Sequence, residues 1–209
     1  MRAAAAVFAA LLCAPAAAVD YAVDSDHWTR DYDPIFEKYA YRYFGPYFDW
    51  RWFKSQAITE SNLNPVTRSA AGAVGLMQIL PSTYAEILRT NPYFADIVSP
   101  RWNIAAGIFY DRFLYRHPAW NRLADQQQLL MAFAGYNAGL GGALKAFKQT
   151  PPPADSWTQV SAYAPRETQG YVTRIVTIKT GAPSPRPAWT LRDPSTRGLA
   201  GKLKRLRGE

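Results

Sequence analysis

The stretch of sequence that says most about the fold spans residues 60–78 and reads ESNLNPVTRSAAGAVGLMQ. It begins with Glu60 and continues through Asn, Pro, Ser and Gly, the residue types of loops. Its small residues let backbone amides and a polymer come close. Ser69 and Gln78 add a hydroxyl and an amide, which suit a ligand made of hydroxyl and acetamido groups. We therefore expect residues 62–75 to be a loop that approaches such a ligand.

The residues before this loop predict a helix that ends at Glu60. Asp49 can cap it. At 100° per residue, a sector of about 80° around the helix axis holds Trp50, Phe53, Ala57 and Glu60, so the glutamate continues the apolar stripe of its own helix. Burial disfavours the charged carboxylate. Two interpretations are open: a helix-end glutamate that reaches water or a partner, or an acid kept partly protonated near neutral pH that can donate a proton.

On both sides of this stretch, the helical spacing of apolar residues and the residues that start and stop helices predict a mainly α chain with short loops. The other expected helices cover residues 34–44, 81–88, 103–115, 125–134, 141–148 and 168–179. The β-branched run at 171–180 also suits a strand, but helix is favoured. No run of alternating strand residues and no internal repeat is evident.

The 209 residues are enough for one domain with tails. We expect the domain at residues 34–180, after a polar and loose N-terminal extension at 19–33. A proline-rich and basic tail follows at 181–209, and it is expected to be disordered. The aromatic count of 7 Trp, 13 Tyr and 10 Phe predicts an aromatic core, with some rings available for a sugar cleft.

Residues 1–18 have the layout of a secretory signal peptide. Arg2 gives the positive start, an apolar stretch runs to about Cys13, and three alanines precede the cleavage site. The stretch is too short to span a membrane as a helix. An apolar N-terminal helix is the alternative. Lipidation of Cys13, the only cysteine, stays open, although the leucines before it argue against a lipid signal.

Five short motifs in a fixed order carry a family resemblance. They are residues 60–61 (ES), 75–78 (GLMQ), 136–139 (YNAG), 167–168 (ET) and 171–172 (YV). Each is modest alone, but the order and spacing are highly specific. Over roughly residues 34–179 the chain resembles the soluble lytic transglycosylase family (family 1, SLT domain). The resemblance implies a lysozyme-like α fold in one domain with a substrate cleft.

The resemblance also implies an activity and a set of site residues. Family members cleave the β-1,4 bond between N-acetylmuramic acid and N-acetylglucosamine in peptidoglycan, and they leave a 1,6-anhydro end instead of adding water. By position, Glu60 matches the catalytic acid. The residues that match substrate-binding positions are Ser69, Gln78, Tyr136, Asn137 and Tyr171. Two positions depart from the family pattern: Gly135 replaces an alanine, which would loosen a helix turn, and Leu80 replaces a methionine of the cleft wall.

Most glycosidases use two carboxyl groups, yet residues 60–78 contain only one. Glu86, Asp96 and Asp111 are expected to be solvated charges. Glu167 belongs to a family motif and is expected to hold structure, with Arg166 or Arg174 as partner. The sequence therefore favours one carboxyl that acts as acid and then as base. Tyr136 and Asn137 either orient this acid or steady the acetamido group of the substrate.

Other chemistry finds little support. The two histidines, His27 and His117, are far apart and lack ligand spacing, so we expect no metal and no cofactor. His117 before Pro118 is expected in a loop at a helix end. Neither Ser61 nor Ser69 has the context of a hydrolase nucleophile.

The remaining expectations concern partners and place. The net charge is +8, and the tail carries seven basic residues against two acidic ones. A solvated tail is favoured, although weak attraction to anionic wall polymer or a membrane surface is an alternative. Nucleic acid is the poorest partner for an exported protein, and the periplasm of a Gram-negative envelope is the expected location. A lysozyme-type hydrolase and a non-catalytic wall-binding scaffold stay open as alternatives.

Overall fold

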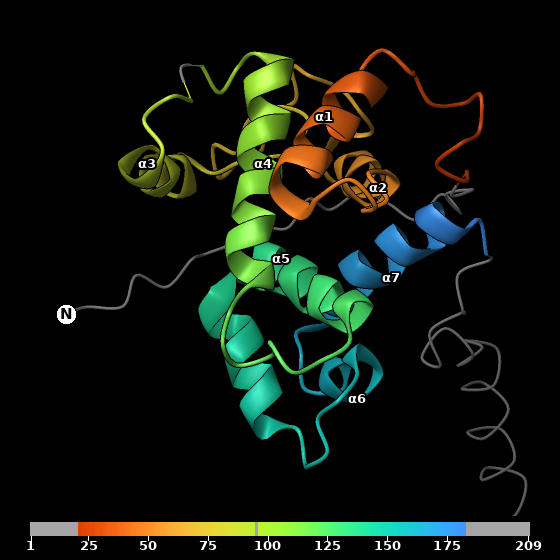
Figure 1. Ribbon diagram of the computed structural model, residues 1–209, viewed down its shortest axis with the longest axis vertical. Coiled ribbons are helices and arrows are strands. Elements are labelled where there is room, and N and C mark those ends of the chain that lie inside the picture. The colour runs from red at the N-terminus through yellow and green to blue at the C-terminus, as the bar shows by residue number, and fades with distance from the viewer. Residues whose placement is uncertain (1–20, 95, 183–209) are drawn as a thin grey trace, which may run out of the picture.

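The computed structural model describes residues 21–94 and 96–182. Within them the chain forms seven helices (Figure 1): α1 (Asp33–Phe44), α2 (Arg51–Ser61), α3 (Pro81–Thr90), α4 (Pro100–Tyr115), α5 (Asp125–Gln149), α6 (Trp157–Ser161) and α7 (Arg166–Thr180). β pairing in this part is limited to isolated bridges in the loop after α2. The prediction of a mainly α chain is confirmed. The predicted signal peptide with Cys13, and the tail beyond residue 182, lie outside the described residues.

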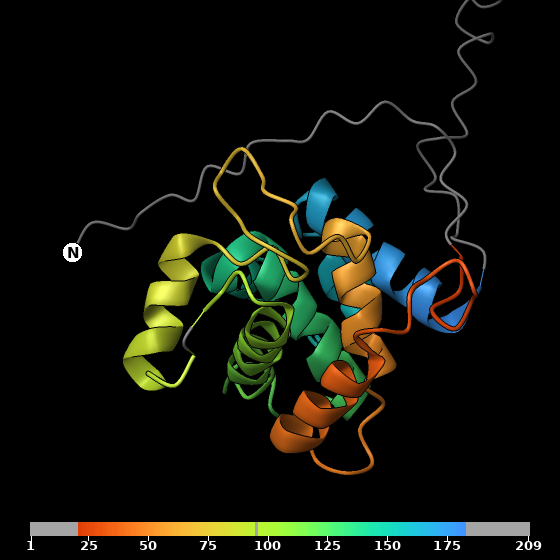
Figure 2. The same ribbon diagram turned by 90° about the horizontal axis from the view of Figure 1, so that it is seen from above.

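Helix α2 lies inside the bundle and packs against α1 and α7 (Figure 2). Phe53 and Ala57 on its predicted apolar stripe are fully buried. Asp49 Oδ1 accepts a hydrogen bond from the Arg51 N–H at 3.0 Å, as the predicted cap would, although the N-cap residue of the helix is Trp50. Asn62 ends the helix in a left-handed conformation, with φ of 53°. The helix therefore places its last turn at a fixed point beside the loop that follows.

Helix α4 runs through the middle of the view in Figure 1 and packs against α1, α3 and α5. The sequence predicts two helices in this stretch, and α5 consists of two helical halves that meet at a kink at Gly139, whose φ of 73° and ψ of 154° are not helical. Gly135, which the sequence predicts to loosen a helix turn, has a packing role in the structure. A Cβ there would lie 3.2 Å from Leu114 Cδ2, so the glycine lets α5 approach α4.

Helix α6 is an element that the sequence interpretation missed. It has only five residues, too few to give a hydrophobic period. Its available signal is the capping box of Ser156 and Gln159. Gln127 of α5 also accepts the Trp157 N–H at 2.7 Å. The short helix is thus fixed by capping and by α5.

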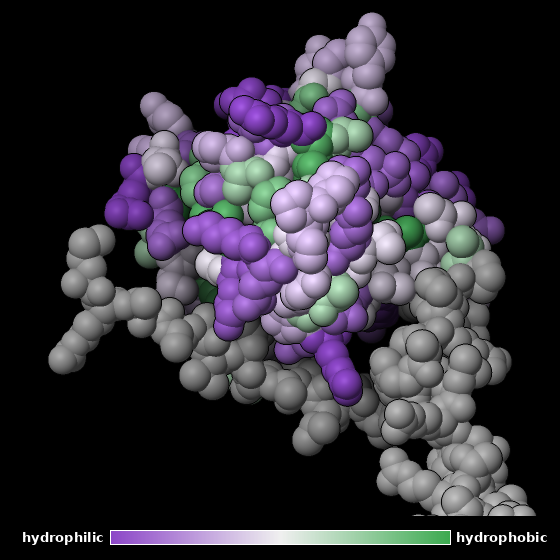
Figure 3. Space-filling view, turned by 90° about the horizontal axis from the view of Figure 1, so that it is seen from below, coloured by the Kyte–Doolittle hydropathy of each residue, from purple (hydrophilic) through white to green (hydrophobic). Residues whose placement is uncertain are grey.

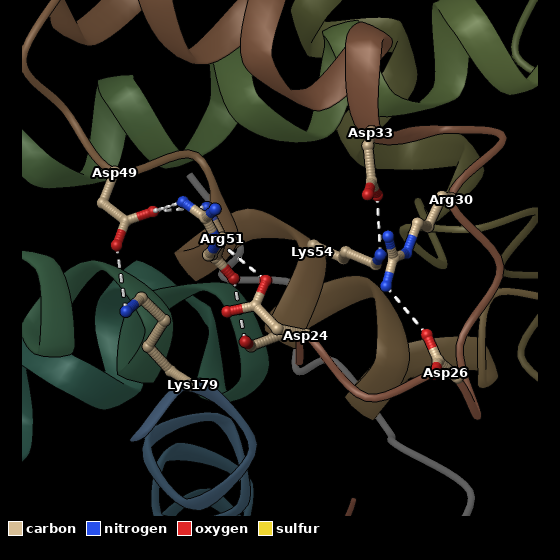
Figure 4. A network of polar contacts seen from close by, with 9 residues as sticks. Asp24, Asp26, Arg30, Asp33, Asp49, Arg51, Lys54 and Lys179 are labelled. Atoms are coloured by element: carbon tan, nitrogen blue, oxygen red, sulfur yellow. Dashed lines mark hydrogen bonds and ion pairs between the residues drawn. The ribbon is translucent and has the colours of Figure 1, made fainter. Parts of the chain in front are cut away.

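The segment before α1 also differs from the prediction of a loose extension. Val23 is 1% exposed, and its N–H donates to Ile178 O of α7 at 2.8 Å. Ion pairs reinforce this docking (Figure 4). Arg51 at the start of α2 pairs with Asp24 of this segment at 2.8 Å, and Asp49, between α1 and α2, pairs with Lys179 of α7 at 2.9 Å. The buried Val23, its backbone hydrogen bond and the Arg51–Asp24 pair together hold the segment against α2 and α7.

A third ion pair in the same region joins α1 to α2 below the surface. Lys54 Nζ lies 2.6 Å from Asp33 Oδ1, and the lysine side chain is only 3% exposed (Figure 4). A buried ammonium group needs such a partner because its desolvation is costly. The pair fixes how the two helices cross.

Surface hydropathy and helix length are the two features of the described residues that concern contact with a membrane. The face in Figure 3 is largely hydrophilic, with hydrophobic residues scattered among the polar ones. Among the described residues, no helix has the length and apolar character that crossing a bilayer would require.

Candidate functional site

A cleft of about 810 Å³ opens where the end of α2 meets the following loop, the middle of α5 and the first half of α7. The structure brings all six predicted site residues into its lining: Glu60, Ser69, Gln78, Tyr136, Asn137 and Tyr171. They come from positions up to 111 residues apart in the chain.

Glu60 lies partly buried in the last turn of α2. The Tyr171 hydroxyl of α7 donates to its Oε1 at 2.6 Å. Burial raises the pKa of Glu60 to about 8; the hydrogen bond from Tyr171 opposes this rise and the charge of Glu167 adds to it. At neutral pH the carboxyl group is therefore mostly protonated, which favours the proton-donor interpretation over a solvated glutamate.

Three hydrogen bonds, donated by the side chains of Ser61 and Arg174, hold the last turn of α2 in place. Ser61 Oγ donates to Leu76 O of the loop at 2.9 Å. Arg174 of α7 donates to Thr59 O at 3.3 Å and to Asn62 Oδ1 at 3.1 Å. The carboxyl-bearing turn is thus tied both to the loop and to α7, and groups held in this way lose little freedom when a ligand binds.

The loop wall is built by its own polar side chains. Gln78 has a positive φ of 44°, and its Nε2 donates to Thr67 O at 3.1 Å and to Gly75 O at 2.8 Å. Among the described residues no donor reaches its Oε1, so this oxygen is available to a ligand. Ser69 Oγ accepts the Ala73 N–H at 3.0 Å and retains its own proton for donation.

Tyr136 and Asn137 hold other partners than Glu60. The Tyr136 hydroxyl donates to Met77 O at 2.7 Å, which ties α5 to the loop. Asn137 Oδ1 accepts the Thr168 hydroxyl at 2.7 Å, which leaves the Asn137 Nδ2 donors for a ligand. Within the described chain, the bond to the Glu60 carboxyl comes from Tyr171. Of the two predicted roles, these contacts favour contact with the substrate over orientation of the acid.

Asp111 contradicts the prediction of a solvated charge. Its side chain is fully buried in α4, and Gln56 Nε2 donates to its Oδ1 at 3.3 Å. Burial raises the pKa of Asp111 well above its usual range. Glu86 and Asp96 are exposed, as predicted. Nothing in the local sequence distinguishes Asp111 from these two, because its burial depends on a partner 55 residues away.

Glu167 also differs from its predicted structural role. It is exposed in the first turn of α7, where it lines the cleft. No salt bridge joins it to Arg166 or Arg174 in the part of the chain that the structure describes. The structure therefore adds a second carboxylate to the cleft wall.

Two further cleft residues were not on the predicted list. Leu80 lines the cleft where the sequence showed a departure from the family pattern. Tyr110 of α4 also lines it, with its ring 5.5 Å from that of Tyr136. The period of α4 marks Tyr110 no differently from its other aromatic residues, so only tertiary packing could assign it.

A metal centre is not evident in the described residues, which contain no group of three His, Cys, Asp or Glu side chains that could hold an ion. His117 lies just after α4, where its Nδ1 accepts the Ala119 N–H. This agrees with the predicted loop position.

Comparisons with known proteins give relatives of one kind. The family model described as "Transglycosylase SLT domain" matches residues 40–158. Membrane-bound lytic murein transglycosylase F of Vibrio cholerae is 30% identical over 143 residues, which cover 66% of this chain and 24% of that protein. The chain thus spans about a quarter of the length of the curated relatives it matches.

Solved structures agree. The 70 kDa soluble lytic transglycosylase of Escherichia coli aligns with a TM-score of 0.59 at 25% identity, over 70% of this chain and 23% of that one. A complex of the 70-kDa soluble lytic transglycosylase with bulgecin A aligns with a TM-score of 0.53 at 26% identity, over 71% and 23%. These matches confirm the predicted lysozyme-like fold.

Proposed function

The chain belongs to the transglycosylase SLT domain family, and from this premise we propose that it is a lytic transglycosylase of peptidoglycan. Its reaction would cleave the β-1,4 bond between N-acetylmuramic acid and N-acetylglucosamine. The observation that carries the proposal is the state of Glu60, a carboxyl group with a pKa of about 8 in a cleft of about 810 Å³. The relatives that match are named as lytic murein transglycosylases.

In the first step Glu60 acts as a general acid. Its proton moves to the glycosidic oxygen as the bond from that oxygen to the anomeric carbon of the muramoyl residue breaks. The positive charge that develops at the anomeric carbon is stabilised by the substrate's own acetamido group or by dipoles of the cleft. The hydrogen bond from Tyr171 holds the carboxyl group in place.

In the second step Glu60, now a carboxylate, acts as a general base. It takes the proton of the C6 hydroxyl of the same muramoyl residue, and O6 attacks the anomeric carbon. A 1,6-anhydro ring forms, no water is consumed, and Glu60 returns to its protonated state. Because the nucleophile belongs to the substrate, its effective molarity can reach about 10⁵ M or more.

The polar groups of the cleft suit an acetamido sugar. Gln78 Oε1 can accept its N–H, while Asn137 Nδ2 and the Ser69 hydroxyl can donate to its carbonyl group. Tyr136 and Tyr171 offer rings to the sugar faces. Since peptidoglycan is the proposed substrate, the cell envelope is the proposed site of action, with export to the periplasm.

Digestion of purified peptidoglycan, followed by mass spectrometry of the muropeptides, tests this function. We expect new glycan ends that are 1,6-anhydromuramoyl residues. Hydrated reducing ends would replace the proposal with a hydrolase, and the absence of any new fragment would replace it with a wall-binding scaffold.

One observation favours the alternative of a hydrolase: Glu167 lines the cleft, and a second carboxylate there could activate a water molecule. Under the transglycosylase proposal, Glu167→Gln should leave the products anhydro. It should also lower the pKa of Glu60, since the charge of Glu167 raises that pKa. The alkaline limb of the activity profile should then move to lower pH. A variant that loses hydrated products would support the hydrolase.

Tyr171→Phe should change the pH dependence of activity in the opposite direction. The hydrogen bond from Tyr171 lowers the pKa of Glu60, so its loss lets that pKa rise above about 8. Proton donation requires protonated Glu60, and the alkaline limb of kcat should therefore move to higher pH. Loss of orientation should also lower kcat by about tenfold, the equivalent of about one hydrogen bond.

The matched control is Tyr163→Phe, because Tyr163 is 44% exposed and does not line the cleft. It should retain the profile of the unmodified protein. An alkaline limb that stays in place in Tyr171→Phe, or moves to lower pH, would contradict the assigned role of Tyr171.

A further inference from the structure

The buried polar pair of Gln56 and Asp111 has no part in the cleft. Gln56 on α2 and Asp111 on α4 both have an exposed fraction of 0%, and neither lines the cleft. One hydrogen bond joins them, from Gln56 Nε2 to Asp111 Oδ1 at 3.3 Å. This bond connects α4 to α2 at a position four residues before Glu60.

Two atoms of this pair lack partners in the described part of the chain. They are Gln56 Oε1 and Asp111 Oδ2. Both accept hydrogen bonds when the aspartate is ionised, so neither can satisfy the other. If Asp111 carries a proton on Oδ2, that O–H becomes the missing donor and Gln56 Oε1 its acceptor. A carboxylic acid and a primary amide then form a ring of two hydrogen bonds.

The surroundings of Asp111 favour the neutral acid. The titratable groups that interact with it are Glu60 on α2, Tyr136 on α5, Tyr171 on α7 and its neighbour Tyr110 on α4. No cation is among them in the described residues. None of the groups acting on Asp111 comes from α1 or α3, which also pack on α4. A buried carboxylate with one long hydrogen bond and no cation is strongly disfavoured.

We propose that Asp111 is a neutral carboxylic acid, closed into a ring of two hydrogen bonds with Gln56, and that this ring is a positioning device for Glu60. Gln56 and Glu60 are four residues apart, so they lie one turn apart on the same face of α2. The ring fixes this stretch of α2 to α4. Because it is neutral, it adds no second negative charge when Glu60 becomes a carboxylate. This second part rests on the proposed role of Glu60.

The first arm of the test measures protonation without using activity. Thermal unfolding is followed from about pH 4 to about pH 9 for Glu60→Gln alone and for Glu60→Gln with Asp111→Asn. The unfolded aspartate releases its proton above about pH 4, whereas the folded one keeps it, so stability falls as pH rises. Asparagine can close the same ring through its Nδ2 and does not titrate.

The unfolding midpoints of the two proteins should therefore be similar near pH 4. For each pH unit above pH 4, the midpoint of the protein with Asp111→Asn should rise relative to that of Glu60→Gln alone by roughly 3–5 °C. A midpoint difference that does not change with pH, or that turns against asparagine as pH rises, would show an ionised Asp111 and overturn the proposal. The infrared band of a protonated carboxyl group, present in Glu60→Gln at neutral pH and lost in the double variant, is the second readout.

The second arm measures positioning in the chain with Glu60 intact. Asp111→Leu removes the ring, and kcat should fall about tenfold with little change in KM, whereas Asp111→Asn should restore kcat. The alkaline limb of Asp111→Asn should stay in place, because no charge is removed. A limb that moves to lower pH would mean that a charged Asp111 had been raising the pKa of Glu60, and would overturn the neutral acid.

An unchanged kcat in Asp111→Leu would contradict the positioning role. If Asp111→Leu does not fold, the pH dependence of Asp111→Asn and the unfolding measurements of the first arm decide whether Asp111 is neutral. The two proposals fail separately. If Glu60→Gln keeps full activity, the proposed function falls, while the unfolding result still decides the state of Asp111.

Discussion

Replacing Glu60 with glutamine should lower the rate of glycan cleavage by about 10³-fold, or about 4 kcal/mol of transition-state stabilisation. Glutamine has the shape of the protonated acid but can neither donate the proton nor take one back. Because Glu60 would serve both steps, no other group of the cleft makes up the loss. The measurement is the initial rate at which new ends appear in purified peptidoglycan.

This variant should remain folded. Its Oε1 can still accept the Tyr171 hydroxyl, and the carboxyl group it replaces is already mostly neutral at pH 7, since burial raises the pKa of Glu60 to about 8. Glycan binding in a sedimentation assay should therefore persist. Glu86→Gln is the matched control, because it makes the same change at an exposed position of α3. Equal rates in the two variants would remove Glu60 from the mechanism.

Asn103→Ala should give the largest loss of stability. The Asn103 side chain is fully buried and makes three hydrogen bonds to backbone groups of loops. Its Oδ1 accepts the Met77 N–H at 2.7 Å, and its Nδ2 donates to Val74 O at 2.9 Å and Ile97 O at 3.0 Å. Alanine leaves these groups unpaired and opens a cavity, so we expect a loss of about 4 kcal/mol.

Urea unfolding measures this loss, with Asn121→Ala as control because Asn121 is exposed in a turn. The control should stay within about 0.5 kcal/mol of the unmodified protein. Cleavage should also weaken in Asn103→Ala, because the affected loop carries Gln78 and the acceptor of Tyr136. A variant as stable as its control would mean that the loop holds its shape without this clamp.

The same clamp explains a glycine that the sequence placed among family motifs without a physical reason. Gly75 has a φ of 78°, and a Cβ there would lie 2.6 Å from Asn103 Nδ2. Only glycine fits the backbone conformation and the approach of the asparagine together. The sequence predicts a loop at this point, but the buried asparagine that shapes it lies 29 residues from Val74.

Helices with a clear period and clear ends could be predicted from the sequence. The proline start and glycine stop of residues 34–44 correspond to α1, and the capped stripe ending at Glu60 corresponds to α2. The break within α5 could be predicted as well, because Gly139 takes the non-helical conformation of a glycine that closes a helix. The continuation of the first half of α5 from residue 134 to the kink could not be predicted, because the same small residues are locally typical of a loop.

Which residues form the site could be predicted better than which hydrogen bonds join them. The ordered motifs contain five of the six predicted residues that line the cleft, and the sixth, Ser69, lies in the loop between the first two motifs. They gave Tyr171 no partner, although it bonds the Glu60 carboxyl, and they assigned Glu167 to structure although it lines the cleft. Residue type and spacing show which groups are available. Which hydroxyl reaches which carboxyl depends on how α2, α5 and α7 pack.

The most direct test of the central claim is the fate of water in the reaction. Peptidoglycan is digested in water enriched in heavy oxygen, and the new muramoyl ends are weighed by mass spectrometry. If Glu60 removes the proton of the C6 hydroxyl and O6 closes the ring, the new ends will be 1,6-anhydro residues and will contain no heavy oxygen. Reducing ends that carry heavy oxygen would show that water is the nucleophile, and would contradict the single-residue acid and base mechanism.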